Sequence, residues 1–380
     1  MAAQGSGMTQ RWSGFASTPG KKMWSLAACA LLCLGLFVGC DGRQPGSGLA
    51  PVADSAATAR PAPSRTVVDM AGRSVRLRQE ITRIGTLGSV PMMNTFVESL
   101  GAGRKIYNQP SKFHDIHGRW KMHLQFAPQL AEGPYFQSAS HDLLIENILE
   151  ADPDVCVTNS RAILDMLDKL GVPVVFVDWS TVDRMMGSVL MMGEVLHEQE
   201  RAAAYVDYFG QMKTRLRTLS ASIPASERRT VLYSNPMQFQ NPGELTEEWL
   251  GVVGAASVTR PAFLEGRRQY DLEELLKWNP DVIFVTSVRT VEELKANQAY
   301  KDVRAVKNDA IVLAPTVGHM WGGHTVEAPI AACWIMHKLY PDLMPRERLA
   351  DEIRYFYRTF FAYEMSERQI DDIIAGRSAA

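Results

Sequence analysis

The feature that most constrains the fold of this chain is a segment that occurs twice. Residues 145–160 read IENILEADPDVCVTNS and residues 272–287 read LEELLKWNPDVIFVTS, and six of the sixteen positions are identical when the two are aligned without gaps. Each copy is a helix-like stretch, then Pro-Asp, then a short apolar run that ends in polar residues. Proline ends a helix, and a short apolar run between turn residues is typical of a buried parallel strand.

The similarity continues on both sides of the repeat. Residues 83–87 (RIGTL) and 229–233 (RTVLY) each lead into a helix-like stretch, and residues 174–178 are echoed by residues 310–314. Strands that alternate with helices, twice over, predict an α/β protein of two lobes with mostly parallel sheets. We place the N-terminal lobe at residues 65–181 and the C-terminal lobe, with its terminal helices, at residues 223–376.

One backbone helix is predicted between the lobes, over residues 182–222. Residues 182–220 have apolar side chains at helical spacing and contain no proline. A single helix of this length is a rod of about 55 Å, which is long enough to join two lobes. Residues 346–375 are expected to form one or two further surface helices.

The first residues have the pattern of an export signal. Arg11, Lys21 and Lys22 precede an apolar run, residues 23–38, that is too short to span a membrane easily. The run ends Leu-Phe-Val-Gly before Cys40 and resembles the bacterial lipobox, although a phenylalanine stands where leucine is usual. The resemblance implies that residues 1–39 are removed and that Cys40 carries a lipid. The alternative is an uncleaved membrane anchor.

Both alternatives place the body of the protein on the periplasmic or other extracytoplasmic face of the membrane. Residues 40–64 are rich in Pro, Gly, Ala and Ser, which is typical of a flexible tether. Two thiols then remain, Cys156 and Cys333, both in apolar surroundings that favour buried packing. The sequence leaves open whether they pair.

The composition narrows the functional classes. The chain is 46% hydrophobic and 22% charged, which is typical of a folded protein with a large core, and its net charge of −2 provides no basic field for nucleic acid. No GxSxG, HExxH or Rossmann fingerprint is present. We therefore expect a binding protein rather than an enzyme, acting as a monomer and without a cofactor.

The predicted layout resembles the class III, helical-backbone substrate-binding proteins of ABC importers. The resemblance covers roughly residues 65–376. Besides the repeat it rests on residues 322–329 and 334–341, GGHTVEAP and WIMHKLYP, which are similar to a run in that family, with Val326 where the family often has proline. It implies an extracytoplasmic protein that captures a metal chelate and hands it to a permease driven by a separate ATPase subunit.

Two acidic residues have the same place in the two copies of the repeat. Glu146 and Glu273 each lie seven residues before the proline of their copy. In the family that the chain resembles, a glutamate at this place on each lobe docks onto the permease, and the resemblance gives these two that role. One negative group per lobe suits a two-fold permease. The alternative is two solvated glutamates early in helices, where negative charge is mildly favourable.

The ligand is expected between the lobes, because open α/β sheets bind ligands outside the carboxyl ends of their strands. Residues 109–140 would form the rim of the N-terminal lobe, with three histidines, a tryptophan and three basic side chains within residues 112–123. Residues 319–324, HMWGGH, face them from the other lobe. The predicted ligand-binding residues are Trp120, His123, Ser160, Trp179, Phe239, Arg267, Arg289, His319, Trp321 and His324.

Aromatic and basic side chains with histidine suit a large metal chelate, with His319 and His324 as candidate metal ligands. A ferric siderophore or related iron complex is the favoured ligand, and cobalamin or haem are alternatives within the same class. A binding protein for bare zinc or manganese would need three or four fixed ligands, whereas the strand ends here carry Asn159, Ser160, Thr286 and Ser287. An oxyanion such as molybdate, held by hydroxyl and amide groups, is the further alternative.

Overall fold

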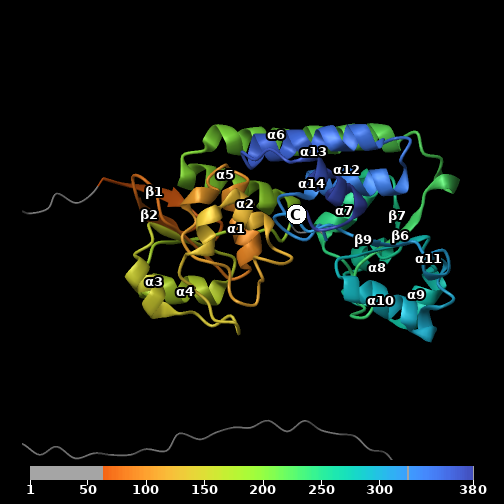
Figure 1. Cartoon of the computed structure of the whole chain (residues 1–380), viewed down its shortest axis with the longest axis horizontal. Coiled ribbons are helices and arrows are strands. Elements are labelled where there is room, and N and C mark those ends of the chain that lie inside the picture. Colours follow the sequence, from red (N-terminus) through yellow and green to blue (C-terminus); the bar gives the residue numbers. More distant parts are fainter. Residues whose placement is uncertain (1–62, 323–324, 380) are drawn as a thin grey trace, which may run out of the picture. The chain divides into compact units, whose positions relative to one another are not determined.

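The computed structural model describes residues 63–322 and 325–379. These residues belong to one compact unit of the chain and form two α/β lobes with mostly parallel sheets, as predicted (Figure 1). The predicted signal peptide, Cys40 and the tether up to residue 62 lie outside the described residues. No helix within the described ranges has the length and apolar character needed to cross a membrane.

The N-terminal lobe is built on a parallel sheet of three strands in the order β3-β4-β5, preceded by an antiparallel hairpin of β1 and β2. The strands are β1 (Ser64–Val68), β2 (Ser74–Arg78), β3 (Ile84–Leu87), β4 (Val155–Thr158) and β5 (Val174–Phe176). The helices are α1 (Val90–Glu98), α2 (Met122–Phe126), α3 (Ile145–Ala151) and α4 (Arg161–Lys169), with short 3-10 turns at Gly103–Lys105 and Pro128–Ala131.

The C-terminal lobe has a parallel sheet of four strands in the order β7-β6-β8-β9. The strands are β6 (Thr230–Tyr233), β7 (Ala256–Ser257), β8 (Val282–Val285) and β9 (Ile311–Leu313). The helices are α7 (Glu244–Val252), α8 (Arg260–Leu264), α9 (Leu272–Trp278), α10 (Val288–Ala296), α11 (Arg304–Lys307) and α12 (Ala328–Leu339), with 3-10 turns at Ala225–Glu227 and Gln298–Tyr300.

The two copies of the sequence repeat have nearly the same local structure. Helices α3 and α9 each end at a residue in the left-handed region, Asp152 with φ 43° and Asn279 with φ 44°. Proline follows in both, and then an aspartate that binds the strand next to its own. Asp154 Oδ2 accepts the N–H and hydroxyl of Thr82, and Asp281 Oδ2 accepts the same two groups of Thr230.

The single rod predicted over residues 182–222 is wrong, because the structure has two helices there. Helix α5 (Val182–Leu196) ends at His197, whose φ of 60° turns the chain, and α6 (Gln199–Ser220) packs against α5. The turn needs Gly193, because a Cβ there would lie 2.5 Å from Cβ of Ala202. Single-sequence periodicity did not reveal this break, since the apolar residues resume just beyond it.

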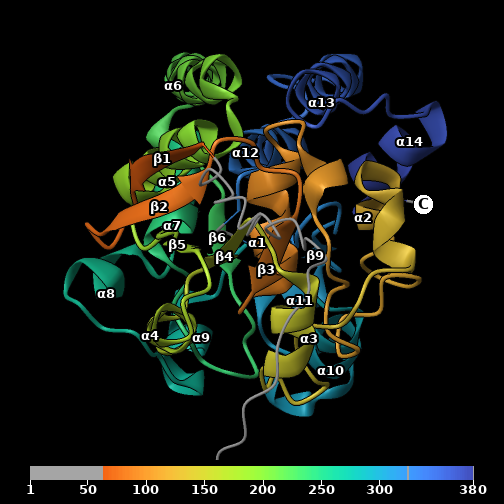
Figure 2. The same cartoon turned by 90° about the vertical axis from the view of Figure 1, so that its left-hand side faces the viewer.

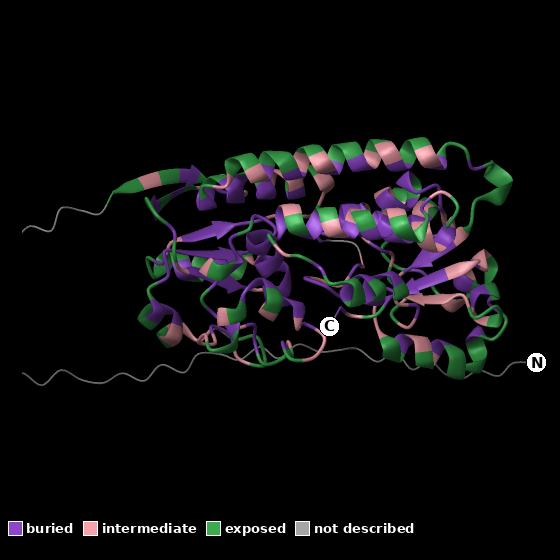
Figure 3. Cartoon of the chain, turned by 45° about the horizontal axis from the view of Figure 1, so that its top comes forward, coloured by how far each residue is buried: buried purple, intermediate pink, exposed green. Residues whose placement is uncertain are grey.

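Helix α6 alone takes the part of the predicted backbone helix. Its buried residues recur every three or four positions, at Ala202, Tyr205, Phe209, Met212 and Leu216, so that one face is buried and the other is exposed (Figure 3). Helix α12, in contrast, is buried along most of its length and contacts α6 and α7. The largest hydrophobic core runs through these helices and includes residues of both lobes.

A second connection returns from the C-terminal lobe. Helix α13 (Arg346–Phe360) lies beside α6, and α14 (Glu367–Ala375) follows it, as the sequence predicted for residues 346–375 (Figure 1). The end of α13 reaches the N-terminal lobe, where the Phe126 ring of α2 lies 4.8 Å from that of Phe361 and 6.0 Å from that of Tyr357. The lobes are therefore fastened together by helices that run in both directions.

The two thiols whose pairing the sequence left open are both free. Cys156 lies in β4 and Cys333 in α12, and burial raises the pKa of each to about 12. A thiol with such a pKa stays protonated and unreactive at ordinary pH. Both cysteines therefore act as small apolar side chains in the core.

Candidate functional site

One arginine of the N-terminal lobe reaches into the C-terminal lobe. Arg119, in the predicted rim, donates from Nε to Thr316 Oγ1 at 2.9 Å and from Nη2 to the carbonyl oxygen of Thr286. Thr286 follows β8 and Thr316 follows β9. The guanidinium therefore lies at the carboxyl ends of parallel strands, where open α/β sheets bind ligands.

The charge of Arg119 is not matched by an acidic side chain. Both of its hydrogen-bond acceptors are neutral, and no ion pair to it occurs within residues 63–322 and 325–379. Burial lowers the pKa of Arg119, although a guanidinium still keeps its proton at any ordinary pH. A partly buried cation without a counter-ion is costly unless an anion joins it.

Aromatic and imidazole rings form a cluster beside this arginine, whose guanidinium lies 5.8 Å from the centre of the Trp120 ring. The Trp120 ring lies 5.6 Å from that of His319, across the two lobes, and 5.6 Å from that of His114. The rings of His114 and His141 are 5.8 Å apart. Burial is the main cause that lowers the pKa of both His114 and His319 to about 4, so these two imidazoles are neutral at ordinary pH.

A buried acid–base pair lies behind this cluster. His123 Nδ1 is 2.7 Å from Glu98 Oε1, and both side chains are fully buried. Burial raises the pKa of Glu98 and by itself lowers that of His123, but the neighbouring carboxylates of Glu98 and Glu327 outweigh it and raise the pKa of His123. The pair is thus held inside the lobe interface.

The C-terminal lobe presents a second buried carboxylate to the same region. Glu327 accepts the N–H of Gly318 at 3.0 Å and that of His319 at 2.6 Å, and Tyr357 donates its hydroxyl to Oε1. Gly318 packs against α1 of the other lobe, because a Cβ on it would lie 2.9 Å from Cγ2 of Thr95. Glu327 therefore fixes the loop that carries His319 against the N-terminal lobe.

Of the predicted ligand-binding residues, the structure brings Trp120 and His319 together at this interface. Trp179 follows β5 and stacks on Phe96 with the ring centroids 6.0 Å apart. Ser160 caps the N-terminus of α4, where its hydroxyl accepts the N–H of Ile163. These two positions keep their predicted places at strand ends.

Two side chains that were predicted to contact the ligand are too deeply buried to do so. Trp321 is 0% exposed and packs edge-to-face on Trp334 in the core, so it does not line a ligand site. His123 is also 0% exposed and is bonded to Glu98, so it supports the interface from behind. Both lie beside residues that face the other lobe. Sequence position alone could not show which side chains face that lobe and which are buried.

The other predicted residues of the C-terminal lobe have local partners. Phe239 packs on Tyr270, Arg267 forms ion pairs with Glu265 and Glu274, and Arg289 is paired with Glu293 on α10 while remaining 84% exposed. Of the two candidate metal ligands, His324 lies outside the described residues. Within the described ranges, no three His, Cys, Asp or Glu side chains are placed to hold a metal ion.

The lobe interface is occupied by the contacts of Arg119 and Trp120. Five cavities of about 310 to 710 Å³ are each lined by residues of a single lobe with adjoining parts of α6 or its linker, or by α6 and α13. A ligand that binds Arg119 therefore either uses the remaining N–H groups of the guanidinium or replaces these hydrogen bonds.

Glu146 and Glu273, the predicted docking residues, are both exposed in the first turn of their helices. Helices α3 and α9 lie on the side of the described unit away from α6, as Figures 1 and 2 both show. The two glutamates thus have matching positions on the two lobes.

Sequence reasoning missed Arg119, His114, Glu98 and Glu327 as functional candidates. Arg119 and His114 belong to the basic and aromatic stretch that the sequence did single out. Glu327 lies within residues 322–329, which the resemblance did single out, although without a role for this side chain. Glu98 gave no signal, because it is an ordinary glutamate near a helix end until the tertiary structure buries it.

Comparison with known proteins agrees with this architecture. The chain matches the periplasmic binding protein family over residues 116–317, more than half of its length. It is 23% identical to the molybdate-binding protein MolA of Haemophilus influenzae over 80% of this chain and 94% of that protein.

Solved structures have the same fold. A periplasmic solute-binding protein of Veillonella parvula superposes with a TM-score of 0.68 at 21% identity, covering 82% of this chain and 97% of that one. MolA bound to molybdate gives 0.66 at 20% identity, covering 80% and 99%. Helicobacter pylori CeuE, in a complex named for nickel and histidine, gives 0.62 at 15% identity, covering 80% and 97%. The chain therefore belongs to the periplasmic binding protein family of ABC transporters, whose members carry a solute as cargo and are not enzymes.

Proposed function

We propose that this protein captures an anionic solute between its two lobes and delivers it to a membrane permease. The observation that carries the proposal is the guanidinium of Arg119, which lies at the strand ends of the opposite lobe and has only neutral partners. A planar guanidinium with free N–H groups pairs strongly with oxyanions and carboxylates.

Two kinds of anion fit this chemistry. One is a small oxyanion, and MolA, the relative that aligns over most of both chains, is a molybdate-binding protein. The other is an anionic metal chelate such as a ferric siderophore, which the sequence favours. A Bacillus subtilis relative named as an iron(3+)-hydroxamate-binding protein is 18% identical over 44% of this chain. The rings of Trp120, His114 and His141 would supply the apolar and aromatic contact area that a chelate needs.

The neutral imidazoles of His114 and His319 favour either ligand. Uncharged rings donate or accept hydrogen bonds at the ligand without adding charge. In a chelate with an open coordination position they could also bind the metal. The proposal therefore names Arg119 as the charge partner and the histidines as neutral partners.

Calorimetric titration distinguishes the two kinds of ligand, the small oxyanion and the anionic metal chelate. Sodium molybdate and a ferric tricatecholate, which carries a net negative charge, are titrated separately into the wild-type protein and into Arg119→Gln. We expect one of them to bind, and Arg119→Gln to weaken that ligand by about 100-fold, since a lost charge-assisted contact costs roughly 1.5–3 kcal/mol. Arg76→Gln, a change at an exposed arginine of β2, is the matched control and should bind normally.

Arg289→Gln tests the sequence-based prediction in the same series. It should leave affinity unchanged if Arg119 is the charge partner, because Arg289 is exposed and already paired. If Arg119→Gln bound the ligand as tightly as the wild type, the proposal would be wrong.

Delivery is proposed to use Glu146 and Glu273 as the contacts with the permease. Each is exposed, each lies in the first turn of an equivalent helix, and the two helices lie on the same side of the described unit. A lipid on Cys40, outside the described residues, would keep the protein at the membrane on which the permease and its ATPase act.

A further inference from the structure

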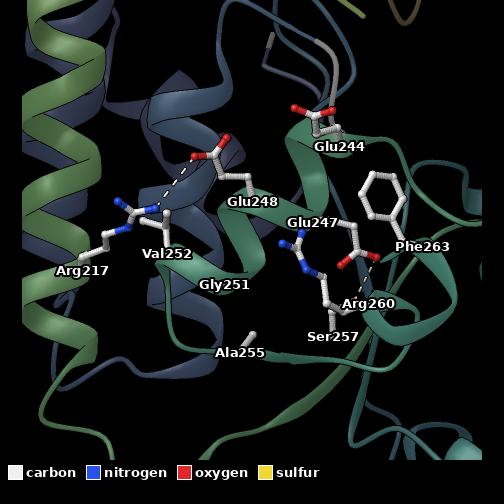
Figure 4. A pocket seen from close by; sticks show the side chains of 10 residues that line it. All are labelled: Arg217, Glu244, Glu247, Glu248, Gly251, Val252, Ala255, Ser257, Arg260 and Phe263. Carbon is white, nitrogen blue, oxygen red and sulfur yellow. Dashed lines mark hydrogen bonds and ion pairs between the residues drawn. The ribbon is translucent and has the colours of Figure 1, made fainter. Parts of the chain in front are cut away.

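A cavity of about 440 Å³ in the C-terminal lobe has an arrangement of charges that the proposed function does not use. It lies against α7, β7 and α8, and its wall includes Glu244, Glu247, Arg260 and Phe263 (Figure 4). We call it the α7–α8 pocket. All of its lining residues come from α6 and the C-terminal lobe, so it is separate from the contacts of Arg119.

The carboxylate of Glu247 is the first unusual feature of the pocket. The residue is 1% exposed, and its Oε1 accepts the hydroxyls of Thr259 at 2.5 Å and Ser257 at 3.2 Å. Its Oε2 is buried and has no hydrogen-bond partner among the described residues. A buried carboxylate oxygen without a partner is costly, and a donor from a ligand would remove that cost.

The guanidinium of Arg260 is the second unusual feature of the pocket. In Figure 4 it is drawn beside the carboxylate of Glu247, and its charge opposes the rise in the pKa of Glu247, yet no ion pair joins Arg260 to any acidic side chain in the described ranges. Its guanidinium lies 5.8 Å from the centre of the Phe263 ring. A ligand that carries both a cationic and an anionic group can pair with the carboxylate of Glu247 and with the guanidinium of Arg260.

Glu244 adds a second carboxylate to the wall, again without an ion pair among the described residues. Figure 4 shows the Phe263 ring and the carboxylates of Glu244 and Glu247 on the wall of the same pocket. Glu248 and Arg217, which also line the pocket, are 3.9 Å apart, and Glu248 binds Lys213 as well. The charges left for a ligand are thus negative, positive and negative, with an aromatic ring beside them.

We infer that the α7–α8 pocket binds a free dibasic amino acid of the lysine type. Its α-ammonium would bind Glu247 and its carboxylate Arg260, while its alkyl chain crosses the Phe263 ring and its side-chain ammonium reaches Glu244. A plain anion would be repelled by two carboxylates, and a plain cation would leave Arg260 unmatched. The cavity volume is sufficient for a ligand of this size.

The test is a calorimetric titration of L-lysine into the wild-type protein at neutral pH. We expect a dissociation constant below about 1 mM. Norleucine lacks the side-chain ammonium, 6-aminohexanoate lacks the α-ammonium and cadaverine lacks the carboxylate, and each should bind at least about tenfold more weakly. Equal binding of cadaverine would overturn the role of Arg260, and absence of lysine binding would overturn the inference.

Variants separate this pocket from the lobe interface. Glu247→Gln keeps the shape of the side chain and should weaken lysine by about 10- to 100-fold, while Glu265→Gln, at an exposed glutamate outside the pocket, should not. Circular dichroism verifies that Glu247→Gln is folded. Arg119→Gln should bind lysine normally; loss of lysine binding in that variant would place the amino acid between the lobes and refute the inference.

A proton measurement adds a readout that a purely structural role would not change. Burial raises the pKa of Glu247, and an ammonium beside it would lower that pKa again. Lysine binding near pH 5 should therefore release protons, seen as a binding enthalpy that depends on the ionisation enthalpy of the buffer. This dependence should disappear in Glu247→Gln, and its persistence there would contradict the assignment.

Discussion

The two lobes share a framework but contribute different chemistry to the space between them. In both, a short helix ends in a left-handed residue, proline follows, and an aspartate binds a threonine at the start of the neighbouring strand. At the interface, however, the N-terminal lobe supplies the cation Arg119 and most of the aromatic rings, and the C-terminal lobe supplies neutral acceptors and the loop held by Glu327. The sequence repeat therefore accounts for the framework and for the paired glutamates, whereas the proposed ligand site is asymmetric.

Reversing the charge of both paired glutamates should have the largest effect. The double charge reversal Glu146→Arg with Glu273→Arg should reduce uptake by about 100-fold or more, because like charges replace both proposed contacts with the permease. Transport into whole cells or vesicles measures this. Ligand affinity should be unchanged, because both residues are exposed and neither is among the hydrogen-bond partners of Arg119 in the described residues.

The single reversals should each give a similar partial loss if the lobes dock symmetrically. Reversal of Glu150, another exposed residue of α3, is the matched control. Normal uptake by the double variant would show that the two glutamates are ordinary surface residues.

The two equivalent aspartates should differ in how much they stabilise the fold. Asp154→Ala should cost about 3 kcal/mol in free energy of unfolding, because its side chain is 5% exposed and accepts three hydrogen bonds besides its ion pair with Arg78. Asp281→Ala should cost about 2 kcal/mol, because that side chain is 18% exposed and its Oδ2 accepts two bonds. Urea denaturation measures both, and a larger loss at Asp281 would reverse the comparison.

Lowering the pH should remove the stability that Asp154 and Asp281 contribute. Burial opposes ionisation of Asp154 and Asp281, but hydrogen bonds from Thr82, Arg83 and Thr230 outweigh it and lower the pKa of both. A lowered pKa in the folded state gives stability that is fully present above the unfolded pKa, about 3.9, and is lost as the pH falls through the folded value.

The interface histidines should make stability fall in a milder pH range. His319 stays neutral in the folded protein down to about pH 4, whereas in the unfolded chain it takes up a proton near pH 6.5. Between these values the unfolded state binds more protons, so stability falls as the pH falls from about 6.5 to 4. His319→Gln should remove about 1–2 kcal/mol of that fall.

His114→Gln, in the other lobe, should remove less, because His114 is only about half-buried and its charge is better screened. Urea denaturation at pH 7 and pH 4.5 measures both variants. An unchanged slope in His319→Gln would mean that the folded protein does not lower the pKa of this histidine.

The smallest predicted effect lies at the ends of the repeated helices. Asp152→Gly should stabilise the protein by about 0.5 kcal/mol, because glycine adopts a φ of 43° without strain and the exposed ion pair with Arg78 contributes little. Asn279→Gly relieves similar strain but should not stabilise, because the Asn279 side chain accepts the N–H of Arg304 at 2.7 Å. Thermal denaturation compares the two, and equal shifts would show that this bond contributes nothing.

Much of the framework could be predicted from single residues and their spacing. The strands near residues 83–87, 155–158, 174–176, 230–233 and 282–285 follow from short apolar runs, and the helix ends follow from Pro153 and Pro280. The antiparallel hairpin of β1 and β2 was not predicted, since its strands alternate exposed and buried residues over only five positions each.

The sequence by itself determined the two α/β lobes, their parallel sheets and the matching glutamates, because hydrophobic periodicity and proline act locally along the chain. Only the tertiary structure decided that the connecting segment folds into two helices, that Trp321 is core, and that Arg119 crosses to Thr286 and Thr316. These outcomes depend on close packing between residues far apart in the sequence, such as Gly193 against Ala202. No local pattern records which side chain of a basic and aromatic stretch will be the one left without a counter-ion.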